Sequence, residues 1–427
     1  MPPSLIKLFN PSTLLDSGVL FIGRICIIGL QILFLKMYST LLVPDELGKY
    51  FFLLTLSYTL NAFLFVALDN YQQAHLYEYV RDGISLRSYI DLNVRVFSPI
   101  LLVIALADMV LYRFYFHYLI PFNLLIFISI FLYLTGLLRG LLNNLEHKRH
   151  VAFIFVLEAS LKVLLFYVFT LMYAPSSTML LCTYLMSLLI VFVVLCFSSH
   201  YYAIFKKGTQ ISIRWNDLLR FAYPLSFGAV INWLQTQGYR MILVPMGNAS
   251  LVGIYTTISN IGSAAYSAFA FIYNQINMPT LYKTQGRSIG THMLNGLIWL
   301  FVIAFAAWIF SPLLVSLASR KEFVPYAYLI LYGILIEGTN LFVGAIGTYY
   351  CIKKTTIKGF YGSIISIISV IPLSFLTYRY FFSVNTIGLP ILLSQMVVAL
   401  SMLFTIRKEI FDSETKSKLK LATKDAL

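Results

Sequence analysis

Three basic residues stand inside long apolar segments of this 427-residue chain. Arg24 and Lys36 lie within one such segment, and Arg240 lies within another far downstream. A charged side chain costs about 2.5 to 3.5 kcal/mol at the middle of a membrane helix, so it is expected to meet a partner there. That partner is either an anion such as a phosphate or an internal carboxylate. The sequence therefore predicts an anion-attracting cavity, with ion pairing as the alternative.

Polar residues accompany these cations on the same helix faces. Gln31 follows Arg24 by seven residues, which places the two nearly on one face. Around Arg240, polar side chains share one side of a helix at 100 degrees per residue, and such a stripe faces protein or water. For most of the amides the alternative role is hydrogen bonding between helices. The side chains predicted to line the cavity are Gln31, Asn232, Gln235, Tyr239, Asn260, Tyr266, Glu337 and Asn340.

Other charges in the apolar segments have simpler interpretations. Glu158 and Lys162 are four residues apart, so they face each other on one helix and are expected to form a neutralising pair. Snorkelling or helix-end contacts are expected to account for Asp69, Asp108 and Arg139, which lie near the ends of their segments.

The segments that hold these residues are long enough to cross a membrane. Hydrophobic residues make up 59% of the chain and charged residues only 11%, unlike a soluble domain of this length. Since a span needs about 20 apolar residues, we predict an all-α polytopic membrane protein with about twelve spans. The predicted spans are 18–42, 48–70, 96–115, 118–142, 152–173, 178–198, 219–245, 250–276, 292–316, 326–350, 358–380 and 385–406.

Orientation follows from the Lys and Arg residues outside the spans, because positively charged loops stay cytoplasmic. Most of them fall in the N-terminus, the even-numbered connections and the C-terminal tail, so both termini are predicted to be cytoplasmic. The odd-numbered connections contain only Lys49, Arg113, Arg320, Lys321 and Arg379.

A repeated motif indicates that the chain is duplicated. The sequence LVPDELGKY, which ends at Tyr50, recurs in altered form as LVPMGNASLVGIY, which ends at Tyr255. Gly48 corresponds to Gly253, and each copy joins two apolar segments. Parallel repeats of this kind build transporters around a pseudo-twofold axis. We predict pseudo-symmetric six-helix bundles at 1–205 and 206–407, with a basic cytoplasmic tail at 408–427.

Motifs for soluble chemistry are absent from the sequence. There is no phosphate-binding loop, no H-E-x-x-H metal motif and no G-x-S-x-G nucleophile elbow. The four cysteines lie apart in apolar surroundings, with no C-x-x-C spacing. The chain is therefore expected not to be an enzyme, and to have neither a metal site nor a cofactor. Nucleic acid is not expected as a partner, since the basic residues are dispersed among loops.

Three short motifs together resemble one family. They are P-D-E-L-G-K-Y after the first span, R-F-A-Y-P-L at the start of the seventh, and G-Y-R followed by G-I-Y across the seventh and eighth. The joint pattern resembles the Wzx-type polysaccharide flippases of the multidrug/oligosaccharidyl-lipid/polysaccharide exporter superfamily, and the likeness covers nearly the whole chain. It implies a MATE-like fold of two bundles around a central, often cationic cavity.

The resemblance implies a function and a location. Such proteins move undecaprenyl-pyrophosphate-linked oligosaccharide repeat units across the bacterial inner membrane by alternating access, for O-antigen, lipopolysaccharide or similar surface polysaccharide biosynthesis. Membrane lipids, a polysaccharide polymerase and a chain-length regulator are the expected partners. Relatives often carry an acid just before the seventh-span arginine, where this chain has Tyr239, so coupling to H⁺ or Na⁺ is left open.

Two other functions fit the sequence. A cation-coupled multidrug exporter of the same fold would bind organic cations through acids such as Asp69, Asp108 or Glu337. A membrane scaffold for glycan assembly would transport nothing. The excess of buried Arg and Lys argues against the exporter, and the duplication argues against the scaffold.

Overall fold

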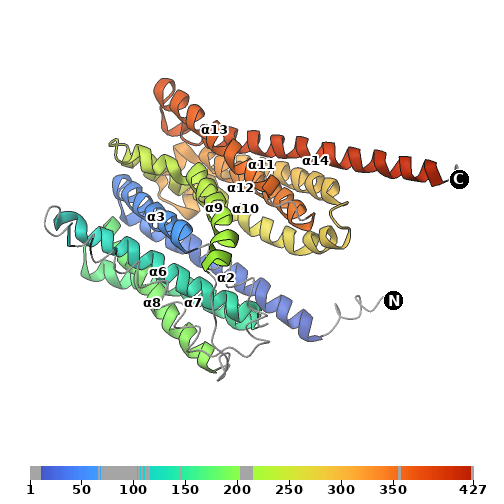
Figure 1. The fold of residues 1–427 in the computed structure, drawn as a ribbon. Helices are drawn as coiled ribbons and strands as arrows, with labels where there is room; N and C mark the ends of the chain where they lie inside the picture. Colours follow the sequence, from blue (N-terminus) through green and yellow to red (C-terminus); the bar gives the residue numbers. More distant parts are fainter. Residues whose placement is uncertain are drawn as a thin grey trace. The chain divides into compact units, whose positions relative to one another are not determined.

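The computed structural model describes residues 11–65, 116–144, 147–201, 215–353 and 357–424, with a few isolated positions between 66 and 115. Within these ranges the chain is built of α-helices joined by short turns and two 3₁₀ segments (Figure 1). It forms two compact units. The first unit contains residues 1–230 and 240–253, and the second contains residues 231–239 and 254–427.

The first unit is a bundle of long apolar helices. In it α6 and α7 both pack against α8, α2 packs along α7, and α3 packs on α6 and α8. Pro44 opens α3 and is followed by Asp45 and Glu46 in the first turn, as the fixed φ of proline and the helix dipole favour. The helices are α2 (Pro11–Leu41), α3 (Pro44–Leu64), α6 (Phe116–Asn144), α7 (Lys148–Met172) and α8 (Ser177–Tyr201).

The second unit is a bundle of the same kind. Here α12 packs against α11 and α14, and α13 packs along α14. Leu281, Ile346 and Tyr350 are at the centre of its core, and each is at most 1% exposed. The elements are α11 (Ile289–Ala318), η2 (Lys321–Leu329), α12 (Ile330–Ile352), α13 (Ile357–Tyr380), η3 (Val384–Thr386) and α14 (Leu389–Lys424).

Two helices are shared between the units. The first unit contains residues 215–230 and 240–243 of α9 (Trp215–Leu243) and residues 249–253 of α10 (Ala249–Lys283). Residues 231–239 of α9 and 254–283 of α10 belong to the second. The division therefore runs through helix interiors. The predicted boundary at residues 205 and 206 lies outside the described residues.

The two copies of the repeated motif lie against each other within the first unit. A Cβ atom on Gly48 of α3 would lie 1.8 Å from the carbonyl oxygen of Ala249. A Cβ atom on Gly253 of α10 would lie 2.1 Å from the carbonyl oxygen of Pro44. No side chain fits at either distance, so both helices depend on glycine for this approach. The reciprocal contact relates the two motifs by a local twofold symmetry.

The helices confirm an all-α polytopic membrane fold. In the described part of the chain, eight helical segments are long and apolar enough to span a bilayer. Large apolar side chains are exposed along them, for example Phe305 and Trp308 of α11 at 63% and 59%. Such surfaces suit contact with lipid. The predicted third span, 96–115, lies outside the continuous described ranges. Residues 408–424 of the predicted tail belong to α14, which continues to Lys424 as the longest helix of the second unit (Figure 1).

Candidate functional site

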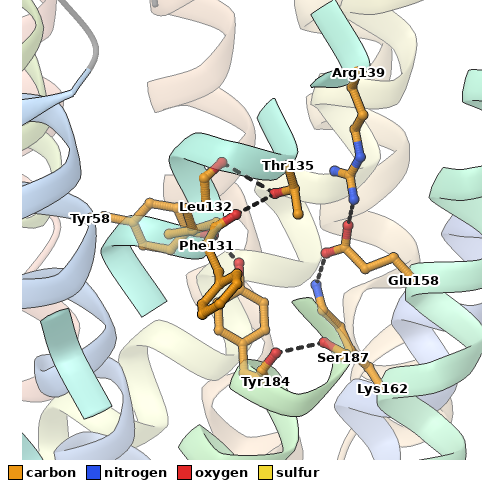
Figure 2. A network of polar contacts seen from close by, with 9 residues as sticks. All are labelled: Tyr58, Phe131, Leu132, Thr135, Arg139, Glu158, Lys162, Tyr184 and Ser187. Carbon is orange, nitrogen blue, oxygen red and sulfur yellow. Dashed lines mark hydrogen bonds and ion pairs between the residues drawn. The ribbon is translucent and has the colours of Figure 1, made fainter. Parts of the chain in front are cut away.

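A charged network occupies the interior of the first unit. The carboxylate of Glu158, on α7, accepts hydrogen bonds from Arg139 of α6 and from Lys162 one turn further along α7 (Figure 2). The Lys162 Nζ to Glu158 Oε1 distance is 2.6 Å. The side chains of Arg139 and Glu158 are 12% and 11% exposed. Two cations thus share one carboxylate, and the network carries one net positive charge.

Aromatic rings surround the two cations. The guanidinium carbon of Arg139 lies 4.5 Å from the centre of the Phe155 ring, and Lys162 Nζ lies 4.3 Å from that of Tyr184. Ring faces stabilise cations where water is absent. The Tyr184 hydroxyl is in turn 2.7 Å from the hydroxyl of Tyr58 on α3 (Figure 2). The network therefore links α3, α6, α7 and α8.

The structure corrects one sequence interpretation and confirms another. The predicted pair of Glu158 and Lys162 is present, as their spacing on one helix requires. Snorkelling was the wrong interpretation for Arg139, whose side chain turns inward to Glu158. The sequence did contain a signal for this ion pair, because an arginine and a glutamate stand in successive apolar segments. Opposite charges in neighbouring membrane helices tend to pair with one another. Asp69 and Asp108 lie outside the described residues.

Arg240 occupies a second buried position in the first unit. The residue is 5% exposed, and its Nη1 donates a hydrogen bond of 3.0 Å to the Thr55 hydroxyl of α3. Its guanidinium carbon lies 5.3 Å from the centre of the Phe51 ring. Tyr38 of α2 is within its electrostatic reach. A buried arginine among hydroxyl and aromatic groups has the chemistry to bind an anionic oxygen.

The other predicted cations are placed along α2. Lys36 is half-buried and lies two residues before Tyr38, which is within the electrostatic reach of Arg240. Arg24 is also half-buried, but twelve residues separate it from Lys36, which is about 18 Å along a helix. Gln31 is exposed. Lys36 and Arg24 are therefore well separated along α2, and a cavity that they share with Arg240 stays a prediction.

Neutral groups form the polar core of the second unit. Gln235 of α9 donates to the Ser394 hydroxyl at 2.9 Å and accepts from Gln395 at 3.1 Å. All three residues are at most 3% exposed. The Tyr239 hydroxyl lies 2.7 Å from that of Thr256. Amides and hydroxyls here join α9, α10 and α14 without any charge.

The remaining predicted residues also belong to the second unit. Glu337 of α12 accepts hydrogen bonds from Asn340 and Ser267. The Tyr266 hydroxyl is buried and has no hydrogen-bond partner among the described residues. Asn232 is exposed and Asn260 is half-buried. Since the predicted set is divided between two units, a cavity shared by all of its members stays a prediction. No cluster of three potential metal-ligating side chains occurs in the residues that the structure covers.

Solved transporters share this fold. The lipid II flippase MurJ, in an inward closed conformation, is 15% identical in sequence with a TM-score of 0.69, over 92% of this chain and 87% of that one. An inward-facing multidrug resistance MATE family transporter of the MOP superfamily is 14% identical with a TM-score of 0.62, over 93% and 99%. A MOP superfamily transporter from Pyrococcus furiosus is 14% identical with a TM-score of 0.54, over 92% and 95%.

Sequence comparisons give no closer assignment. No protein-family profile matches the chain, and no curated protein matches it. The structural likeness covers more than nine tenths of this chain in each case, so it defines the fold of the whole molecule. The chain is thus a multi-pass membrane protein with the fold of MOP-superfamily transporters. Its structural neighbours include both lipid flippases and drug transporters.

Proposed function

We propose that this protein is a flippase for a lipid-linked oligosaccharide with a pyrophosphate linker. Its cargo would be an undecaprenyl-pyrophosphate-linked repeat unit of O-antigen or a similar surface polysaccharide. The protein would move this unit from the cytoplasmic to the outer leaflet of the bacterial inner membrane by alternating access, with both termini in the cytoplasm. A polymerase and a chain-length regulator would act on the product.

The observation that supports this proposal best is the burial of Arg240. Arg240 is 5% exposed, and its guanidinium lies beside the Thr55 hydroxyl and the Phe51 ring. An ionisable residue inside an apolar membrane bundle is by default a candidate functional residue. A pyrophosphate offers several anionic oxygens that a guanidinium binds well. The likeness of the fold to that of a lipid II flippase supports the same class of cargo.

The predicted residues then have distinct roles. Arg240 and Lys36 would attract the pyrophosphate, and Arg24 would contact it at another stage of transport. Asn232, Gln235, Tyr239, Asn260 and Tyr266 would meet the sugars, while Glu337 and Asn340 would line the same path. The prenyl chain would stay in lipid, since hydrocarbon excludes only the charged headgroup. A coupling ion, H⁺ or Na⁺, remains to be assigned by transport measurements.

The proposal is tested by deleting the gene and examining the surface polysaccharide on gels. We expect the polymer to be lost, and to return with the wild-type gene but not with the Arg24→Ala/Arg240→Ala double variant. Membrane levels of the variant must equal those of the wild type. Normal polysaccharide with the double variant would exclude the role assigned to the cations.

A multidrug exporter is the second candidate, because MATE transporters share the fold. It would need an acid that is accessible to an organic cation. Of the acids considered for that role, only Glu337 is in the described part of the chain, and it is held by Asn340 and Ser267. Drug resistance on expression, together with an unchanged polysaccharide in the deletion strain, would favour the exporter. If the deletion does not alter the polysaccharide and expression gives no drug resistance, a membrane scaffold would be favoured.

A further inference from the structure

A small groove lies between α10 and α11 in the second unit. Its volume is about 330 Å³, near the lower end of the range for small-molecule sites. Phe269, Tyr273 and Asn277 line it from α10, at successive intervals of four residues along one face. Asn295 and Trp299 line it from α11, also four residues apart. Tyr273 is also part of the packed interior at 6% exposed, whereas Trp299 is 49% exposed.

Aromatic rings form one side of the groove. The centre of the Phe269 ring lies 5.7 Å from that of Trp299 and 5.7 Å from that of Tyr273. Trp299 is 49% exposed, so one face of its indole is open. An open indole face beside a second ring is suited to the apolar face of a flat or ring-shaped ligand.

Amide groups supply the polar side of the groove. Asn277 donates one N–H to the backbone carbonyl of Tyr273 at 2.9 Å, which leaves its oxygen and its second N–H. Asn295 is exposed on a helix whose neighbouring exposed residues, such as Leu294 and Ile298, are apolar. Its amide can donate and accept hydrogen bonds, so it can bind a polar ligand in the groove.

A buried histidine behind the groove also lacks a partner. His292 is 7% exposed, and neither ring nitrogen has a hydrogen-bond partner among the described residues. Its ring centre is 4.9 Å from that of Tyr273, whose hydroxyl donates to the His292 carbonyl at 2.5 Å. His292 itself does not line the groove, and it contributes by fixing Tyr273, which does.

The groove lies near one end of its helices. Asn277 is six residues before the end of α10, and Asn295 is six residues after the start of α11, which puts both about 9 Å from the connecting turn. That turn holds Arg287, which is exposed, and the charge pattern predicts that it faces the cytoplasm. The groove is therefore close to the end of α10 and α11 that the charge pattern predicts to be cytoplasmic.

We propose that this groove is a loading subsite for a sugar ring of the lipid-linked cargo. The indole of Trp299 would stack on the ring, and the amides of Asn277 and Asn295 would bind its hydroxyls. This inference rests on the proposed flippase function and adds a position outside the cationic residues. It assigns recognition of the sugar to α10 and α11, before the pyrophosphate reaches Arg240.

The test compares two probes that differ only in the sugar. Full-length protein in phosphatidylcholine nanodiscs is titrated with farnesyl-pyrophosphoryl-N-acetylglucosamine and with farnesyl pyrophosphate. Trp299→Leu and Asn295→Leu are the test variants, since leucine preserves membrane insertion. Trp308→Leu is the matched control, because Trp308 is exposed at 59% on the same helix and does not line the groove. Transport of the sugar probe is measured in parallel in proteoliposomes.

We expect Trp299→Leu to weaken binding of the sugar probe roughly tenfold, which is the scale of one aromatic contact. Binding of farnesyl pyrophosphate should be unchanged. Asn295→Leu should act in the same direction, and Trp308→Leu should change neither probe. Equal weakening of both probes, or no difference between Trp299→Leu and Trp308→Leu, would overturn the subsite. Wild-type protein that transports no probe would instead contradict the flippase proposal, whatever the binding data show.

Discussion

Each unit contains a buried polar network that joins its helices, and these two networks differ in charge. In the first unit, Arg139, Glu158 and Lys162 form an ionic network with one net positive charge. In the second unit, Gln235, Ser394 and Gln395 form a neutral network at even lower exposure. Both networks tie helices together inside an apolar bundle. Only the first has a charge that an ion, a proton or a substrate can act upon.

This difference separates two reasons for keeping polar groups in a membrane protein. Neutral hydrogen bonds between membrane helices contribute modestly, on average about 0.6 kcal/mol. A buried ion pair adds little net stability, but removal of one partner leaves an uncompensated charge and costs much more. The charged network is therefore sensitive to the loss of its shared carboxylate, whereas the neutral one should tolerate apolar replacement. The following variants test that contrast.

Glu158→Leu should have the largest effect. It removes the carboxylate that both Arg139 and Lys162 contact and leaves two like charges in the bundle. We expect the free energy of unfolding to fall by about 3 to 5 kcal/mol. The loss of stability is measured by thermal unfolding of the purified protein in detergent, with size-exclusion chromatography as the readout of the folded fraction. A loss below about 1 kcal/mol would mean that water or lipid headgroups already solvate the network.

Gln235→Leu should have a smaller effect in the second unit. It breaks the hydrogen bonds to Ser394 and Gln395, while Ser394 keeps its own hydrogen bond to the Ile391 carbonyl at 2.9 Å. The expected loss of stability is about 1 kcal/mol in the same unfolding assay. If this variant is as unstable as Glu158→Leu, charge is not what distinguishes the two networks.

Lys162→Met should have a still smaller effect, although it removes a charge from the same network. Arg139 and Glu158 remain as a neutral pair, and methionine retains the contact with the Tyr184 ring. The expected change in stability is about 0.5 kcal/mol in either direction. A large loss would show that both cations are needed to hold Glu158. Normal stability with lost transport would indicate that the net charge serves function.

Glu46→Gln tests a charge at the surface of the same unit and should have the smallest effect. Partial burial raises the pKa of Glu46, but hydrogen bonds from the Ser177 backbone N–H at 2.8 Å and from Lys49 lower it more, so the net shift is downward. Because the pKa of Glu46 is lower in the folded than in the unfolded protein, its ionised carboxylate stabilises the fold at pH values above the unfolded-state pKa. That stabilisation is lost as the pH falls through the folded-state pKa. We expect a contribution of about 0.3 kcal/mol at neutral pH that disappears in acid. Unfolding curves of the wild type and Glu46→Gln, recorded from pH 7 to pH 3, should converge at the acidic end.

Much of the fold could be predicted from the sequence because its signals are local. Each membrane span is a long apolar run, and the pairing of Glu158 with Lys162 follows from the geometry of one helix. The contact between Arg139 and Glu158 depends on how α6 and α7 rotate against each other, which no local pattern specifies. The sequence therefore identified both residues but assigned Arg139 the wrong environment.

The repeat illustrates the same limit. The match of Gly48 with Gly253 predicted a duplication, but not that the two glycines would face each other across α3 and α10. The candidate groove between α10 and α11 was not predicted from the sequence. Ring contacts such as that between Phe269 and Trp299 arise only from the packing of two helices.

The most direct test of the account is transport in a purified system. Proteoliposomes with the wild type, Arg240→Ala or Arg287→Ala are loaded with a fluorescent undecaprenyl-pyrophosphate-linked oligosaccharide, and its appearance in the opposite leaflet is followed by quenching. Arg287 is the matched control, since it is an exposed loop arginine. The account predicts transport by the wild type and Arg287→Ala, and none above protein-free vesicles by Arg240→Ala. Equal transport by Arg240→Ala and the wild type would contradict it.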